Sequence, residues 1–372
     1  MNIDRRLLTI ACLVAVGAGV IFFHLQSGDA PSPEETYRET MYYSERSDGR
    51  LGCGICFRNC ILDEGEVGFC RNRKNIGGVL YNLVYGKPSA VQVDPVEKEP
   101  QHHFLPGSRI LCIGTAGCNF RCRFCHNWTL SQRDIESVGR VLDKPPEEVV
   151  DRALREDIPT ISFTYNEPTS FYEYMYDTAK LAQEAGLRVI FHSNGSMNPE
   201  PLRALLPHID AVTIDLKGFD EAFYREITEG ELDPVLQTLE IIRESGTWLE
   251  IVNLVVPTLN DYPDDIRAMC RWIASHLGTD IPLHFNRFSP AYRLPTLHPT
   301  PVETLEMAYE IAREEGLEFV VIGNVPGHHN NSTFCPDCGS VLIQRHHFTV
   351  LDNRIEEGSC PDCGHPVPGI WR

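Results

Sequence analysis

The sequence predicts an α/β protein built around a partial (β/α)6-type TIM barrel. Two observations support this fold. Short apolar stretches alternate with segments of helix length that carry one apolar face, and most of these segments end at a glycine. Strands that alternate with helices of ten or more residues indicate parallel βαβ units. Six or seven such units suit a full or partial barrel, and a doubly wound sheet is the alternative.

The expected elements follow one another regularly from about residue 109. Seven strands are expected, at residues 110–113, 160–164, 189–191, 211–214, 249–256, 283–285 and 319–322. The first helix opens at Pro145 and Pro146 with acidic residues in its first turn, which favours a helix N-terminus. Further helices are expected at residues 174–185, in a short stretch after residue 201, and at 234–244, 264–277 and 302–315. Glycines follow four of them, as is common at helix C-termini.

The charge balance excludes one class of partner. Among 372 residues, Lys and Arg number 33 and Asp and Glu number 52, so the formal net charge is −19. Sequence-independent nucleic-acid binding needs a cationic face, and the sequence has no polybasic run. We therefore expect no nucleic-acid partner. The apolar fraction of 42% is close to that of globular domains, so the chain can form a sizeable core.

The N-terminus contains an apolar run, LLTIACLVAVGAGVIFFHL at residues 7–25, without a charged residue. At about 1.5 Å per residue, this run is long enough to span a bilayer as a helix. A cleaved signal peptide is the alternative, but the run is longer than usual for such a peptide and no clear cleavage site follows it. We expect a single-pass membrane anchor over residues 1–28, followed by a flexible linker over residues 29–50 that is rich in Ser, Pro and acidic residues.

Three cysteines lie close together in CNFRCRFCHNW, residues 118–128. They are Cys118, Cys122 and Cys125, here called the central cysteine triplet, and their spacing is C-x3-C-x2-C. A structural metal site usually has four protein ligands, whereas a catalytic metal keeps one position open. Three thiolates on an iron–sulfur cubane would leave one iron open in the same way. A zinc ion with a fourth ligand from His126 or Cys112 is the alternative.

Polar residues follow the expected strands, at the strand ends where barrel chemistry occurs. They are Asn166, Glu167, Ser193, Asn194, Asp215, Lys217, Asn286 and Asn324. Any one of them is ordinary turn or helix-cap chemistry. Because the carboxyl ends of parallel strands meet at one mouth of a barrel, we expect the set to gather around a single site.

Several segments resemble a known enzyme superfamily. CNFRCRFC resembles the cysteine signature of radical S-adenosylmethionine (SAM) enzymes, with Phe124 as its aromatic residue. The segments YNEP, HSNG, IDLKGF and HFNRFSPAY are similar to the branch related to pyruvate formate-lyase activating enzyme. The stretches CGICFRNCILDEGEVGFCRNR, LVYGKPSA, DPVEKEP, HHFLPGS and IGTAGCNF are most similar to radical SAM enzymes of the AmmeMemoRadiSam system. The resemblance runs from about Leu51 to the C-terminus and implies a radical SAM core over residues 101–330.

The resemblance implies two cofactors and a reaction. The central cysteine triplet would hold a [4Fe–4S] cluster whose fourth iron binds the amino and carboxylate groups of SAM. The cofactor-binding residues that it implies are Phe124 for the adenine, Asn166 and Glu167 for the amino group, Asn194 for the ribose, and Asp215 and Lys217 for the carboxylate. In this family the reduced cluster cleaves SAM to methionine and a 5′-deoxyadenosyl radical, which abstracts a hydrogen atom from a protein or small-molecule substrate. Activation of a glycyl-radical enzyme is one version.

Two C-x2-C pairs near the C-terminus predict a closed metal site. Cys335, Cys338, Cys360 and Cys363 form this C-terminal cysteine set, and each pair is followed by a glycine. Four thiolates close the coordination sphere of a structural metal. We expect a zinc-ribbon-like module over residues 331–372, with zinc favoured over a rubredoxin-like iron site that has the same ligands.

A third group of cysteines precedes the expected barrel. Cys53, Cys56, Cys60 and Cys70 form this N-terminal cysteine set within a Cys-rich segment, residues 51–100. Their spacing matches no standard motif, so three interpretations stay open. The set binds zinc, holds a second cluster that feeds electrons to the first, or consists of reduced structural thiols.

The expected partners and location follow from this chemistry. A radical SAM enzyme implies a low-potential electron donor of the flavodoxin or ferredoxin type. The alternative function is a non-catalytic, membrane-tethered metal-binding or electron-transfer module, although such a module has no need of the polar residues at the barrel mouth. Arg5 and Arg6 before the apolar run favour a body outside the cytoplasm. SAM, a strong reductant and free thiols favour the cytoplasm, and we expect the cytoplasmic side.

Overall fold

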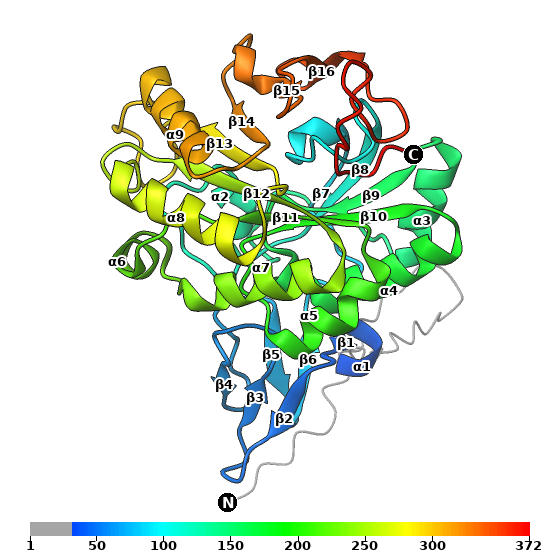
Figure 1. The fold of residues 1–372 in the computed structure, drawn as a ribbon. Helices are drawn as coiled ribbons and strands as arrows, with labels where there is room; N and C mark the ends of the chain where they lie inside the picture. Colours follow the sequence, from blue (N-terminus) through cyan, green and yellow to red (C-terminus); the bar gives the residue numbers. More distant parts are fainter. Residues whose placement is uncertain (1–31) are drawn as a thin grey trace, which may run out of the picture. The chain divides into compact units, whose positions relative to one another are not determined.

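The computed structural model describes residues 32–372 (Figure 1). The expected membrane anchor at residues 7–25 lies outside the described residues and stays a prediction. Within residues 32–372, no helix is long and apolar enough to cross a membrane. Helix α1 (Pro33–Thr36) belongs to a unit that ends at Thr36, and residues 37–372 form a second unit, which is described from here on.

The central sheet of this unit has the strand order β14-β13-β12-β11-β10-β9-β8-β7. Strands β8 to β14 run parallel in chain order, and β7 is antiparallel to β8 at one edge. The strands are β7 (Ala90–Pro95), β8 (Arg109–Gly114), β9 (Thr160–Phe163), β10 (Arg188–Ser193), β11 (Ala211–Asp215), β12 (Trp248–Val255), β13 (Leu283–Arg287) and β14 (Val320–Gly323). Within residues 37–372 no pairing joins β14 to β7. Neighbouring strands in the sheet are also consecutive along the chain. The sheet is therefore an open, partial barrel and not a doubly wound sheet.

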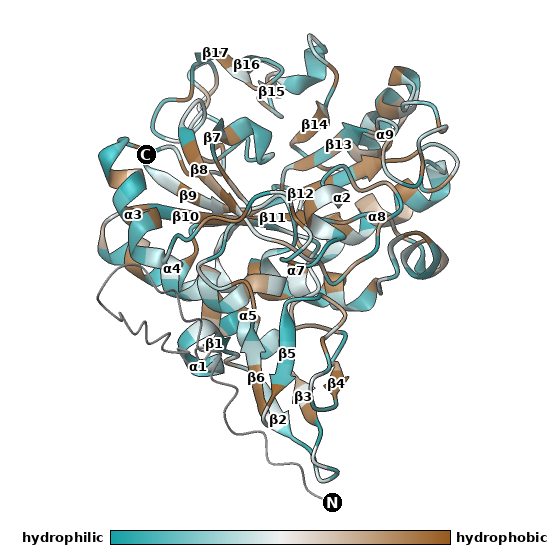
Figure 2. Ribbon diagram, turned by 180° about the vertical axis from the view of Figure 1, so that it is seen from behind, coloured by the Kyte–Doolittle hydropathy of each residue, from teal (hydrophilic) through white to brown (hydrophobic). Residues whose placement is uncertain are grey.

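A helix lies in each crossover between consecutive parallel strands. The helices are α3 (Pro146–Arg155), α4 (Tyr172–Glu184), α5 (Pro199–Leu205), α7 (Asp233–Ser245), α8 (Pro263–His276) and α9 (Val302–Glu314). Right-handed crossovers place such helices on one face of the sheet, and Figures 1 and 2 show them around the outside of the strands. The apolar side of α3, with Val149, Val150 and Ala153, is buried as its spacing predicts. Helix α7 ends at Gly246, whose φ of 78° favours glycine.

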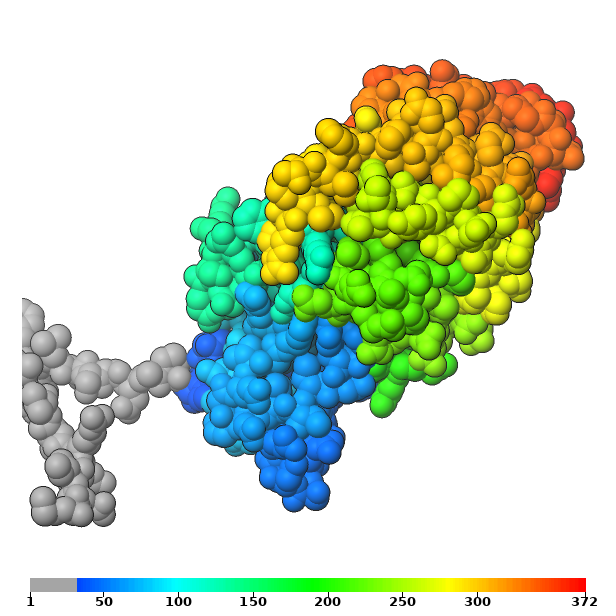
Figure 3. Space-filling model, turned by 90° about the vertical axis from the view of Figure 1, so that its left-hand side faces the viewer, coloured from blue at the N-terminus to red at the C-terminus, as the bar shows by residue number. Residues whose placement is uncertain are grey.

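Two small antiparallel sheets precede the barrel. One has the order β1-β6-β5 and the other β2-β3-β4. Their strands are β1 (Arg38–Glu39), β2 (Tyr43–Glu45), β3 (Leu51–Cys53), β4 (Ile61–Leu62), β5 (Arg73–Ile76) and β6 (Val79–Asn82). The linker expected over residues 29–50 therefore contains β1 and β2, which pair with β6 and β3. Figure 3 shows this blue segment lying directly against the green part of the barrel.

The third small sheet follows the barrel. It has the order β15-β16-β17 and consists of β15 (Thr333–Phe334), β16 (Val341–His346) and β17 (Thr349–Asn353). Its strands pair antiparallel. The sheet carries the C-terminal cysteine set on the loops at its ends, within the range expected for the ribbon-like module.

A buried ion pair joins the N-terminal segment to the barrel. Arg73 on β5 donates through Nη2 to Oε2 of Glu173 on α4 at 2.9 Å, and the two side chains are 3% and 0% exposed. Asn82 donates to the same carboxylate oxygen at 2.6 Å. Arg73 Nη1 also donates to the carbonyl oxygen of Ser170 at 2.8 Å. The pair is fully hydrogen-bonded on the carboxylate side, which a buried charge requires.

Removing one partner of this pair is expected to destabilise the protein strongly. Arg73→Met leaves the Glu173 carboxylate buried without its counter-ion, which costs about 3–5 kcal/mol of unfolding free energy. Arg38→Met is the matched control, because the ion pair of Arg38 with Asp177 leaves 52% of the arginine side chain exposed and is worth at most about 1 kcal/mol. Urea unfolding of both variants measures the difference. Equal losses in the two variants would contradict the account.

Candidate functional site

The central cysteine triplet lies on the loop between β8 and the short helix α2 (Trp128–Ser131). Gly117 precedes the triplet with a φ of 80°, and a Cβ there would overlap the carbonyl oxygen of Cys70. Only glycine fits such a left-handed and closely approached position without strain. The start of the cysteine loop therefore packs closely against the N-terminal segment.

A cavity of about 210 Å³ opens at the carboxyl ends of the barrel strands. Its lining contains the three cysteines and the six cofactor-binding residues that the resemblance implies: Cys118, Cys122, Cys125, Phe124, Asn166, Glu167, Asn194, Asp215 and Lys217. Ser193 and Asn286 also line it. Asn324 does not: its side-chain amide donates to the carbonyl oxygen of Arg287 at 3.4 Å instead. The fold brings together residues from five strand ends that are far apart in the sequence.

Cys122 is buried and Cys118 and Cys125 are half-buried, and this affects the ionisation of their thiols. Burial raises the pKa of Cys122 to about 12 and that of Cys118 well above its ordinary value. Burial also raises the pKa of Cys125, although the hydroxyl of Ser131 lies 3.2 Å from its sulfur and opposes this shift. A thiolate at these positions therefore needs a positively charged metal centre beside it.

A charged triad lines the same cavity as these cysteines. Lys217 donates to Oδ2 of Asp215 at 2.8 Å, and His192 Nε2 lies 2.9 Å from Oδ1 of the same carboxylate. Burial by itself raises the pKa of Asp215, but Lys217 and His192 outweigh it and hold that pKa well below its usual range. Burial likewise lowers the pKa of Lys217, and Asp215 outweighs it, so the ammonium keeps its charge.

Asp215 also makes the contribution of His192 to stability depend on pH. Burial lowers the pKa of His192, but Asp215 outweighs this effect and places that pKa above its ordinary value near 6.5. A raised pKa means that the charged pair stabilises the folded state fully below about pH 6.5, and that this contribution is lost as the pH rises through the folded-state pKa. His192→Gln is therefore expected to lose more unfolding free energy at pH 6 than at pH 9. Anaerobic urea unfolding measures this, and a pH-independent loss would contradict it.

The side chains of Asn166 and Glu167 hold strand ends together. Glu167 accepts hydrogen bonds from the hydroxyl of Ser193 at 2.7 Å and from the backbone N–H of Asn194 at 2.8 Å. It also accepts from Thr169 and so caps a short helix. Asn166 accepts from the backbone N–H of Thr115 at 2.9 Å. These side chains line the cavity, but their polar atoms are bonded to the protein.

Asn194 is engaged in the same way. Its side-chain amide donates to Oδ1 of Asn119 at 2.8 Å, and its Oδ1 accepts from the backbone N–H of Ser196 at 3.2 Å. Asn119 follows Cys118 directly, so Asn194 fixes the first turn of the cysteine loop against β10. Neither Asn119 nor His192 was assigned a role from the sequence. The sequence signal that could have identified His192 is its position directly before Ser193 and Asn194, the polar residues expected to follow this strand.

The comparisons with known proteins agree with this geometry. Residues 112–273 match the family model described as Radical SAM superfamily. The "Uncharacterized protein MJ0808" of Methanocaldococcus jannaschii is 45% identical over 332 residues, which cover 89% of this chain and 98% of that relative. The chain belongs to the radical SAM superfamily.

Other relatives of this radical SAM enzyme are more distant. The pyruvate formate-lyase-activating enzyme of Clostridium pasteurianum is 26% identical over 174 residues, 45% of this chain and 70% of the relative. Among solved structures, Streptococcus suis SuiB bound to S-adenosylmethionine has a TM-score of 0.47 at 14% identity, with 62% of this chain and 53% of that chain covered. The resemblance to the superfamily is confirmed, and the finer resemblance to the AmmeMemoRadiSam system stays a prediction.

Membership of the superfamily implies a [4Fe–4S] cluster and SAM, and the donor set of the cavity suits both. Cysteine thiolates are the usual ligands of iron–sulfur clusters. Of the described residues that line the cavity, three are cysteines, and they come from one loop. The same cavity contains a partly buried ammonium at Lys217 that can meet a carboxylate. The cavity of this radical SAM enzyme therefore brings three thiols and one ammonium together, a donor set that suits the two cofactors.

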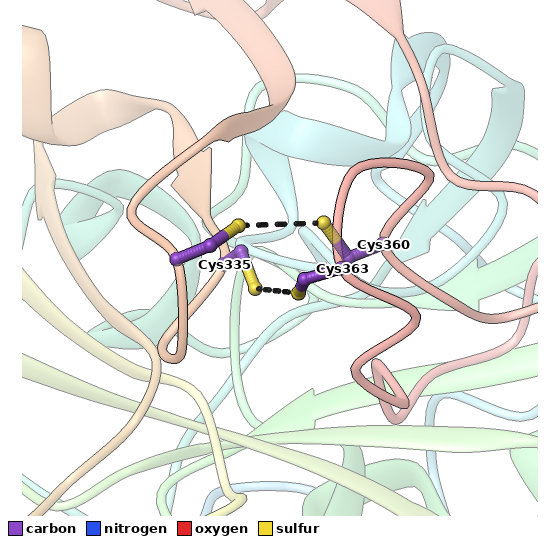
Figure 4. Close-up of side chains that lie close together, drawn as sticks. Cys335, Cys360 and Cys363 are labelled. Carbon is purple, nitrogen blue, oxygen red and sulfur yellow. Dashed lines mark hydrogen bonds between the residues drawn. The ribbon is translucent and has the colours of Figure 1, made fainter.

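The C-terminal cysteine set forms a compact four-sulfur site. Its sulfur atoms all lie within 4.8 Å of one another. Those of Cys335 and Cys363 are 3.6 Å apart, and those of Cys338 and Cys360 are 3.7 Å apart. Figure 4 shows the sulfurs of the two loops facing one another. This group can hold one metal ion, as the paired C-x2-C spacing predicts, and zinc and iron use the same four thiolates.

Removal of one of these ligands is expected to release the metal. Cys360→Ser should lose about one bound ion per chain and lower the melting temperature, because a bound metal stabilises only the folded state. Ser340→Ala is the control, since Ser340 lies 3.3 Å from the sulfur of Cys338 and is not a ligand. Metal analysis by mass spectrometry, together with thermal unfolding, measures both effects. Unchanged metal content in Cys360→Ser would contradict the site.

Proposed function

We propose that this protein is a SAM-cleaving radical enzyme in which the central cysteine triplet holds a [4Fe–4S] cluster with one iron left for SAM. The observation that carries the proposal is the composition of the cavity. Three thiols and the ammonium of Lys217 line the same cavity, and no fourth cysteine is among its described lining residues. When bound, these cofactors supply the one-electron reductive cleavage of SAM, and the resulting carbon-centred radical removes a hydrogen atom from the substrate.

The residues around the cavity have distinct tasks in this proposal. Lys217 binds the SAM carboxylate as a point charge, and Asp215 holds the ammonium in place through its 2.8 Å contact. Phe124 presents its backbone to the adenine, while its ring stacks on that of Phe223 at a centroid distance of 6.2 Å. Asn194 is the residue proposed to contact the ribose. Because its side chain is hydrogen-bonded to Asn119 in the cysteine loop, this contact requires the loop to stay in the position seen here.

Asn166 and Glu167 act as positioning residues for the SAM amino group. Their side chains are bonded to Thr115, Thr169 and Ser193. In this proposal, backbone carbonyl oxygens of the same segment accept hydrogen bonds from the SAM ammonium. The left-handed φ of 71° at Tyr165 turns the chain at this point, and such strained backbone is frequent at binding sites.

A second cavity is the proposed route for the substrate. It has a volume of about 390 Å³ and shares Asn127, Thr164, Tyr165 and His192 with the first cavity. A hydrogen donor bound there lies next to the position proposed for SAM. We leave open whether the hydrogen donor is a protein, as for glycyl-radical activation, or a small molecule.

We also propose that a flavodoxin- or ferredoxin-type protein supplies the electrons. Residues 7–25 are proposed to anchor the enzyme to the cytoplasmic face of a membrane.

A spectroscopic titration tests the proposal. Protein reconstituted anaerobically with iron and sulfide and reduced by dithionite is expected to show an iron–sulfur EPR signal whose g values change when SAM is added. Such a change requires SAM to reach the open iron. A well-loaded cluster that does not respond to SAM would overturn the proposal and favour a non-catalytic electron-transfer module.

A further inference from the structure

The N-terminal cysteine set gathers around one cavity, although its members are up to 17 residues apart in the sequence. Cys53 ends β3, two further members lie in the loop to β4, and Cys70 lies in the turn before β5. Three of the four are buried, Cys60 is half-buried, and none forms a disulfide. Four free thiols around one cavity suit a metal-ligand set better than a disulfide framework.

The sulfurs of this set are less closely gathered than those of the C-terminal cysteine set. The sulfurs of a mononuclear four-thiolate site lie within a few ångströms of one another, as they do in the C-terminal cysteine set. In the described part of the chain, that set is the one group of three or more His, Cys, Asp or Glu residues whose ligand atoms all lie within 4.8 Å of one another. The sulfurs of the N-terminal cysteine set do not all lie within that distance of one another, and the four residues line one cavity. A polynuclear cluster, which holds its thiolates farther apart than one ion does, suits this arrangement better than zinc.

The surroundings of the cavity suit a negatively charged cluster that is shielded from water. Almost all of the exposed lining is apolar, and Ile55 and Leu62 contribute to it. Arg58 and Arg73 also line the cavity. The backbone N–H groups of Ile55 and Arg58 favour the thiolate forms of Cys53 and Cys56. Hydrogen bonds to the sulfurs and low solvent exposure are the features by which proteins hold and tune iron–sulfur clusters.

This cavity lies beside the cavity of the central cysteine triplet. Asn119 lines the cavity of the N-terminal set, while Cys118 lines the other. Consecutive Cα atoms are about 3.8 Å apart, so one residue step separates the two linings. Arg58 strengthens the connection, because its Nε donates to the carbonyl oxygen of Asn119 at 3.0 Å. Gly117 packs on the carbonyl of Cys70 from the same loop.

We propose that the N-terminal cysteine set holds a second [4Fe–4S] cluster that exchanges electrons with the cluster of the central triplet. In each transfer one electron enters from a low-potential flavodoxin- or ferredoxin-type protein, reduces this second cluster, and leaves for the first; no covalent bond changes. Four protein thiolates leave no iron open here, so this cluster does not bind SAM. The relay rests on the proposed function, whereas the presence of the cluster does not.

Iron content decides whether the second cluster exists. Anaerobically reconstituted wild-type protein is expected to contain about eight iron atoms per chain in clusters. A Cys118→Ala/Cys122→Ala/Cys125→Ala variant should keep about four, with a Mössbauer spectrum of a four-thiolate [4Fe–4S] cluster. Wild-type protein with only about four cluster irons, or with zinc at two sites, would overturn the proposal. These results do not depend on SAM cleavage, so a failure of the proposed function is seen separately.

Variants of the N-terminal cysteine set give the complementary measurement. Cys53→Ala/Cys56→Ala should lose about four iron atoms. Because substitutions at buried positions can prevent folding, Cys60→Ser at the half-buried position provides a second test and should also lower the iron content.

In the reduced wild-type protein, adjacent paramagnetic clusters should give a broadened, spin-coupled EPR signal. In the Cys118→Ala/Cys122→Ala/Cys125→Ala variant this signal should become a simple uncoupled one. An uncoupled spectrum of the wild-type protein would contradict the proposed proximity of the two clusters.

Discussion

Cys122→Ala is expected to reduce 5′-deoxyadenosine formation to background and to remove about four iron atoms per chain. Cys122 is buried at 7% exposure and lies on the cavity wall between the other two members of the triplet in sequence. Two thiolates cannot hold a cubane with a single open iron, so the site for SAM is lost with the cluster. Anaerobic turnover with dithionite, followed by chromatography of the products, measures the loss together with iron analysis.

Cys270→Ala is the matched control for this variant. Cys270 is a fully buried cysteine on α8 that packs in the barrel core and lines neither cysteine cavity. Its replacement removes one sulfur and costs a little stability, but iron content and product formation should stay at the wild-type level. Product formation by Cys122→Ala above background, with iron retained, would contradict the ligand assignment.

Lys217→Met should weaken SAM binding by about 10- to 100-fold, because a charged hydrogen bond contributes about 1.5–3 kcal/mol. The side chain of Lys217 is 12% exposed and is held 2.8 Å from Asp215. The substitution removes the positive charge proposed for the SAM carboxylate and leaves Asp215 with His192 as its remaining partner. Isothermal titration of the reconstituted protein with SAM measures the change.

Two comparisons separate a local loss of charge from a general loss of structure. Lys217→Arg keeps the charge and should bind SAM more tightly than Lys217→Met. Lys144→Met removes an exposed lysine that pairs with Glu148 and should leave SAM binding unchanged. Equal affinity of Lys217→Met and wild-type protein would contradict the role of the lysine.

The barrel could be predicted because its signals are local. Each parallel strand is a short apolar run, and the glycine after α7 marks the end of that helix in the sequence itself. Strand β7 could not be predicted in the same way. It contains Gln92 and Asp94, its residues are only partly buried, and it is held by pairing with β8. Strands β1 and β2 were missed for the same reason, since each is two or three residues long and exists through its partners.

The candidate site shows the same division between local and tertiary information. The spacing of the central triplet and the DLK segment identify cysteines, an aspartate and a lysine from sequence alone. The bonds of Glu167 to Ser193 and Asn194 depend on β9 and β10 being neighbours, which no local pattern encodes. The partnership of His192 with Asp215 likewise follows from the pairing of β10 with β11.

The production of 5′-deoxyadenosine by reconstituted wild-type protein tests the central claim most directly. Protein with a full complement of iron is incubated anaerobically with SAM and dithionite, and the products are quantified by liquid chromatography and mass spectrometry. We predict 5′-deoxyadenosine and methionine in equal amounts, formed only when both SAM and the reductant are present. Absence of 5′-deoxyadenosine from protein whose iron content and cluster spectrum are complete would contradict the claim.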